Sequence, residues 1–75
     1  MKYAGEVIEL MSAFPGREFR MIQLVKYINP KADTRARQAI RIGVARVIAG
    51  LVETGSVKGL PTSAGRGGYS LYRWI

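Results

Sequence analysis

The chain has 75 residues, of which 48% are hydrophobic and 23% charged, so it is apolar enough to fold and long enough for one modest core. It contains no Cys and no His, which excludes a disulfide framework, a thiolate or imidazole metal site, and catalysis by either side chain. We therefore expect a single domain over residues 1–75 that is not an enzyme and needs no cofactor.

The charge is strongly positive and unevenly distributed. Twelve Lys and Arg against five Asp and Glu give +7, and residues 20–75 hold ten of the bases but only two of the acids. Such a field attracts polyanions. Nucleic acid is the first candidate partner, and an anionic membrane surface is the second.

No membrane-spanning or targeting segment is predicted. Glu6 and Glu9 interrupt the N-terminal stretch, where a signal sequence would need an apolar core. Arg41 and Arg46 interrupt the longest apolar run, which is also shorter than the roughly 20 residues of a spanning helix. We expect a soluble, cytoplasmic protein.

Residues 2–14 predict a first helix, because their apolar residues recur at helical spacing. The predicted core stripe consists of Tyr3, Val7, Leu10, Met11 and Phe14. Pro15-Gly16 ends the helix, since proline disfavours helical geometry in the residue before it.

A short extended stretch is predicted over residues 17–20, followed by a short helix over 21–28. The apolar positions of that helix are Met21, Leu24, Val25 and Ile28. Residues 29–32 form a turn, after which Asp33 or Thr34 can cap the next helix. Two short helices joined by a turn allow a helix-turn-helix arrangement.

Residues 34–54 predict a third helix with two different faces, ended by Gly55. The core face contains Ile40, Val44, Val47, Ile48 and Leu51. The opposite face contains Arg35, Gln38, Ile42, Ala45, Arg46 and Ala49, with Arg41 at the border. Gly43 and Gly50 lie on a flank, and since glycine costs roughly 1 kcal/mol in a helix, we expect another helix to pack closely there.

Residues 56–75 predict a β-hairpin with strands at 56–60 and 69–75. The intervening loop holds three Gly, one Pro and one Arg. An isolated hairpin is marginally stable, so its apolar side must lie on the helices. We expect Tyr69, Tyr72 and Trp74 to serve packing rather than base stacking.

This order of elements resembles the winged helix-turn-helix DNA-binding domains. The stretch Leu51-Val52-Glu53-Thr54-Gly55-Ser56-Val57 is also similar to the segment in which such domains pass from the recognition helix to the hairpin, called the wing. The resemblance covers nearly the whole chain and implies an α+β fold, a three-helix bundle with a C-terminal β-hairpin. Chains of this size resemble the compact transcriptional regulators of bacteria, phages and mobile elements.

The resemblance implies that the 34–54 helix enters the major groove and the wing contacts the backbone or minor groove of double-stranded DNA. Arg suits guanine, Gln suits adenine, and Ile suits the thymine methyl group. The predicted base contacts are Arg35, Gln38, Ile42 and Arg46. The predicted backbone contacts are Arg17, Arg20, Lys31, Thr34, Arg37, Arg41, Lys58 and Arg73, and Arg66 is the predicted minor-groove contact.

Three hypotheses about function stay open at this stage. The first is sequence-specific DNA binding without catalysis, as a homodimer or a cooperative assembly on repeated half-sites. The second is a protein-interaction module that docks through a strip of small apolar residues on the 34–54 helix, namely Ala39, Ile42, Ala45 and Ala49. The third is RNA or single-strand binding through the Tyr and Trp residues.

Overall fold

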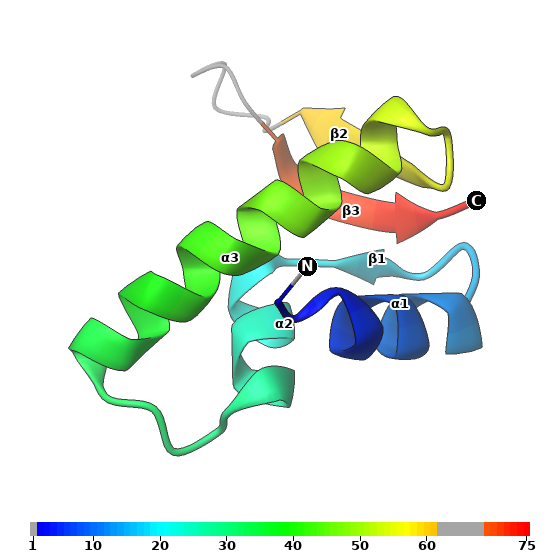
Figure 1. Ribbon diagram of the computed structural model, residues 1–75. Helices are drawn as coiled ribbons and strands as arrows, with labels where there is room; N and C mark the ends of the chain where they lie inside the picture. The colour runs from blue at the N-terminus through cyan, green and yellow to red at the C-terminus, as the bar shows by residue number, and fades with distance from the viewer. Residues whose placement is uncertain (1, 62–68) are drawn as a thin grey trace.

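The structure, a computed structural model, describes residues 2–61 and 69–75. It is an α+β domain with three helices and a three-stranded antiparallel sheet, consistent with a winged helix (Figure 1). The elements are α1 (Ala4–Ala13), β1 (Glu18–Phe19), α2 (Met21–Ile28), α3 (Thr34–Glu53), β2 (Val57–Pro61) and β3 (Tyr69–Trp74). Each was predicted from the sequence to within about two residues at either end.

The helix α3 is the element around which the others pack. Its predicted core face is confirmed, since Ile40, Val44, Val47 and Ile48 are all buried and Leu51 is partly buried. This stripe packs against α1, α2 and β2. Figure 1 shows α3 crossing in front of the hairpin, with its N-terminal half extending past the sheet beside α2.

Both ends of α3 are fixed by local hydrogen bonds. At the start, the Asp33 carboxylate accepts the Ala36 N–H at 2.8 Å, as expected for an N-cap. At the end, Gly55 has a φ of 85° and its N–H donates to the Val52 carbonyl, while the Ser56 N–H donates to the Leu51 carbonyl. This pair of bonds is a Schellman motif, which requires the left-handed conformation that glycine adopts without strain.

The strand β3 lies in the middle of the sheet, between β1 and β2. It pairs with β2 to form the predicted hairpin, and the buried Val57 lies opposite Trp74. Tyr72 and Trp74 pack against the core, so the expectation that they serve packing is confirmed; the Tyr69 side chain is outside what the structure describes. The pairing of β1 with β3 was not predicted, because a two-residue strand has no periodicity from which a partner can be inferred.

The first helix is shorter than predicted, and one of its stripe residues is not in the core. Tyr3 precedes the helix with a φ of 71°, and Phe14 follows it in a non-helical conformation. Val7 and Met11 are buried as expected, but Phe14 is 46% exposed. Pro15 explains the difference, because it keeps Phe14 out of helical geometry and so turns its ring off the stripe.

The two glycines of α3 have different surroundings. A Cβ atom at Gly43 would lie 2.7 Å from two atoms of the Tyr3 ring, whereas a Cβ atom at Gly50 would have no neighbour within 4 Å. The expected close approach is therefore confirmed at Gly43, where the contact comes from the residue that precedes α1. It is wrong at Gly50.

Replacing each glycine by alanine should separate these two situations. Gly50→Ala should raise the free energy of unfolding by about 1 kcal/mol, because alanine favours the helix and nothing obstructs the methyl group. Gly43→Ala should give no such gain and a loss of about 1 kcal/mol, because the Tyr3 ring must move. Urea unfolding of the two variants measures the difference. Equal stabilisation by both would contradict the Tyr3 contact. In a Tyr3→Ala background, which is itself less stable because Tyr3 packs against the core, Gly43→Ala should raise the free energy of unfolding relative to Tyr3→Ala alone.

Candidate nucleic-acid interface

The four residues predicted to contact bases all lie exposed on the side of α3 away from its buried stripe. These are Arg35, Gln38, Ile42 and Arg46. Gln38, Ile42 and Arg46 are spaced by four residues, so they form one row along the helix. Ile42 is 50% exposed, so its apolar side chain is accessible to a ligand. The row therefore offers an amide, an apolar group and a guanidinium in order.

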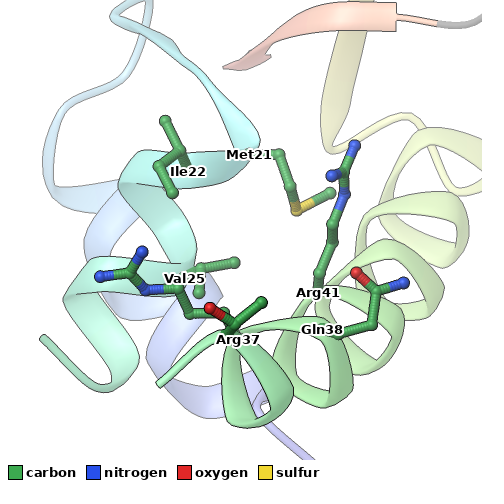
Figure 2. Close-up of a pocket in the computed structure, with 7 residues that line it drawn as sticks. Met21, Ile22, Val25, Arg37, Gln38 and Arg41 are labelled. Atoms are coloured by element: carbon green, nitrogen blue, oxygen red, sulfur yellow. The ribbon is translucent and has the colours of Figure 1, made fainter. Parts of the chain in front are cut away.

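A groove lies between α2 and the N-terminal half of α3 and has a volume of about 310 Å³. It is lined by Met21, Ile22 and Val25 of α2 and by Thr34, Arg37, Gln38 and Arg41 of α3. Figure 2 shows the Arg41 side chain extending beside Met21, with the Arg37 guanidinium on the other side of the groove, close to α2. This α2–α3 groove brings together three predicted backbone contacts and one predicted base contact.

The backbone around the groove is held by short-range hydrogen bonds. The Arg20 N–H donates to Oε1 of Gln23 at 2.7 Å at the start of α2, and the Lys31 N–H donates to Oδ1 of Asn29 at 3.1 Å in the turn. Ala32 is buried at 6% exposure and anchors this turn to the core. Arg20, Lys31 and Thr34 are therefore exposed cationic or polar residues on a fixed backbone beside the groove.

Lys58 and Arg73, two other predicted backbone contacts, lie away from the groove. They face each other in adjacent strands, at the end of the hairpin where β2 begins and β3 ends. Glu18 lies opposite Arg73 on its other side, so the sheet places a carboxylate next to this cation. In Figure 1 this end of the sheet, near the C-terminus, is remote from the N-terminal half of α3.

Arg17 lies at the same remote end, where the Gly16 N–H donates to the Trp74 carbonyl at 2.9 Å. Its guanidinium carbon is 5.3 Å from the ring centroids of both Phe14 and Phe19, which is within cation–π distance. This contact gives Arg17 a structural role in covering the two rings. Whether it also contacts DNA stays a prediction.

Arg66, the predicted minor-groove contact, lies in the loop outside the described residues. Its role stays a prediction from the sequence.

A second, apolar hollow of about 280 Å³ lies between the C-terminal half of α3 and β3. It is lined by Ala45, Ile48, Ala49, Val52 and Tyr72. Two residues of the predicted small apolar strip, Ala45 and Ala49, therefore line a real concavity, and all four strip residues are exposed. The outer side of α3 thus has Arg35 and Gln38 toward its N-terminus, whereas toward its C-terminus the small Ala45 and Ala49 lie beside Arg46.

The sequence did not identify the α2 side of the groove. The apolar spacing of the helix at 21–28 predicts Met21 and Val25 on its core stripe and predicts no role for Ile22. The available signal was that Ile22 falls off that stripe, which predicts an exposed apolar residue, and it is in fact 45% exposed.

No protein-family model matches the chain, and comparisons with curated proteins and with solved structures gave no significant match. No helix in the described ranges is long and apolar enough to cross a membrane.

The Asp33 cap fixes where α3 begins and so positions the candidate contacts in its first turns. Asp33→Ala should lower the free energy of unfolding by about 1 kcal/mol, because the Ala36 N–H loses its acceptor. Asp33→Ser, which keeps a capping oxygen, should recover most of the loss in thermal or urea unfolding. If Asp33→Ser were as unstable as Asp33→Ala, the cap would not be the cause.

Proposed function

We propose that the protein binds double-stranded DNA in a sequence-specific manner, without catalysis, and acts as a small transcriptional regulator. The observation that supports this most directly is the outer face of α3. That face exposes Arg35, Gln38, Ile42 and Arg46 together on the longest helix of the described chain. We place α3 in the major groove.

The row of Gln38, Ile42 and Arg46 suits base recognition. An α-helix rises about 1.5 Å per residue, so neighbours in this row are about 6 Å apart along the axis. Base pairs are stacked about 3.4 Å apart, so successive side chains meet base edges roughly two pairs apart. Gln38 suits adenine, Ile42 the thymine methyl group and Arg46 guanine, while Arg35 suits a further guanine.

The cations around the α2–α3 groove suit phosphate binding. Arg37 and Arg41 line the groove, Arg20 is the N-cap residue of α2, and Lys31 lies in the turn before α3. Contacts of this kind fix the register of a protein on the duplex without reading sequence. In this proposal Arg66 of the wing loop reaches the adjacent minor groove, and two copies bind repeated half-sites because one small module buries little surface.

Selection of bound duplexes from a random pool is the primary test of this function. We expect a defined motif that combines guanine with A·T pairs. Failure to enrich any duplex over the starting pool would refute the proposal.

Arg35→Ala combined with Gln38→Ala tests direct recognition by α3. Each side chain should contribute about 1–3 kcal/mol of discrimination, so affinity for the selected duplex should fall by more than tenfold. Affinity for an unrelated duplex should fall much less, since it depends on phosphate contacts. Fluorescence anisotropy at fixed salt measures both. Unchanged affinity for the selected duplex would exclude recognition through the first turns of α3.

Two charge-matched double variants test which cations contact phosphate. Arg37→Gln with Arg41→Gln should weaken the salt dependence of DNA binding. The slope of log K against log salt should become less negative by about 1.8, at about 0.9 per lost phosphate contact. Lys58→Gln with Arg73→Gln removes the same charge from the remote end of the sheet and should change the slope by less than half as much. A slope that Arg37→Gln with Arg41→Gln leaves unchanged would show that the groove is not the phosphate-binding surface.

The apolar hollow favours one competing function, docking of a protein through Ala45 and Ala49. An apolar interface responds weakly to salt, whereas phosphate binding weakens steeply. A partner that binds the protein equally well at low and high salt, together with no duplex selected from the pool, would support this alternative.

A further inference from the structure

The α2–α3 groove has an apolar floor that contact with DNA phosphates does not use. Ile22 is 45% exposed, Met21 is partly exposed, and Val25 closes the bottom at 2% exposure. In Figure 2 the Met21 and Ile22 side chains lie on the α2 side of the groove, opposite the arginine-bearing turns of α3. Covering this floor removes apolar surface from water, which favours a ligand with a bulky apolar group.

The rim of the groove carries a net positive charge. The lining residues include two arginines, Arg37 and Arg41, and no carboxylate. The α2 segment contains no acidic residue. Asp33, the N-cap of α3, lies next to the groove-lining Thr34, and its single negative charge offsets at most one of the two arginine charges. The rim therefore favours an anionic partner.

Arg37 and Arg41 are one helical turn apart, which sets their Cβ atoms about 5–6 Å from each other. Two carboxylates one turn apart on a facing helix have the same spacing. An apolar residue between them on that helix would lie over Ile22 and Met21. The groove is thus complementary to an amphipathic helix in both charge and polarity.

We infer that the α2–α3 groove binds an acidic amphipathic helix of another protein, with an apolar side chain on Ile22 and carboxylates on Arg37 and Arg41. DNA phosphates can pair with the arginines of the rim, but DNA has no side chain that would cover the apolar floor formed by Met21, Ile22 and Val25. The volume of about 310 Å³ holds a few side chains, so the ligand is a short segment of the partner.

This partner competes with DNA. Thr34, Arg37, Gln38 and Arg41 line the groove and are also proposed DNA contacts, so one surface serves both ligands. Binding of the helix therefore releases the protein from its site, which is a regulatory mechanism. The competition rests on the proposed function, but the binding of the helix does not.

The test uses the full chain and a displayed library of short helical peptides of unbiased composition. We expect enriched clones to place Asp or Glu one turn apart around Leu, Ile or Phe. A synthetic peptide from the best clone is then the probe. Its affinity, measured by fluorescence anisotropy, should fall at least tenfold for Ile22→Ser and for Arg37→Gln with Arg41→Gln. It should change less than twofold for the matched variants Ile8→Ser, on exposed α1 surface, and Lys58→Gln with Arg73→Gln.

Competition with the selected duplex completes the test. The peptide should displace labelled duplex from the unmodified protein, and Ile22→Ser should abolish displacement while changing duplex affinity less than twofold. Circular dichroism checks that Ile22→Ser remains folded, and Ile22→Val, which keeps the apolar floor, should retain peptide binding.

Three outcomes would overturn the inference. These are no enriched peptide, enriched peptides without acidic residues, or peptides that bind the Ile22 and arginine variants unchanged. A dimer that Ile22→Ser dissociates, with no peptide enriched, would assign the groove to a second copy of the chain. If the peptide binds as expected but no duplex is selected, only the proposal of DNA binding is refuted. The groove then still binds the acidic helix.

Discussion

The structure depends on the buried stripe of α3, formed by Ile40, Val44, Val47 and Ile48. A chain of this size builds one core, and α3 supplies four of the eleven buried hydrophobic residues in the described part of the chain while its other side faces solvent. Burial of the stripe fixes the rotation of α3 about its axis, and the Asp33 cap and the Gly55 terminus fix where it begins and ends. The outer face therefore has a defined orientation without needing any contact of its own, which is the condition for recognising a ligand with little rearrangement.

Most of the fold could be predicted from the sequence because its signals are local. Periodicity located α2 and α3, and Asp33 and Gly55 marked the ends of α3 through chemistry that acts within a few residues. The failures have tertiary causes. The pairing of β1 with β3 joins segments far apart in the chain, and Gly50 has no packing partner even though it lies one heptad from Gly43. Phe14 shows that a proline effect on the preceding residue can override a periodic pattern.

The candidate site could be predicted only where it lies on a single element. The exposure of Arg35, Gln38, Ile42 and Arg46 follows from helical geometry once the core face is known. The groove needs two helices to be placed beside each other, so the contribution of Ile22 could not be inferred from either helix alone. The register of the strands places Arg73 between Lys58 and Glu18, at the end of the sheet away from the groove. The positions of these charges along the sequence do not reveal this arrangement.

The central position of β3 leaves β1 and β2 as the two edges of the sheet. Unpaired edge strands are templates for pairing with other molecules, and their usual protection is short length, charge, or proline. Here β1 has only two residues, and β2 contains Lys58 and Gly59 and ends at Pro61. Lys58 therefore opposes edge-to-edge aggregation whether or not it contacts DNA. Under the proposed DNA binding, copies gathered on one duplex would be close together, and these short, charged or proline-ended edges would then oppose pairing between their sheets.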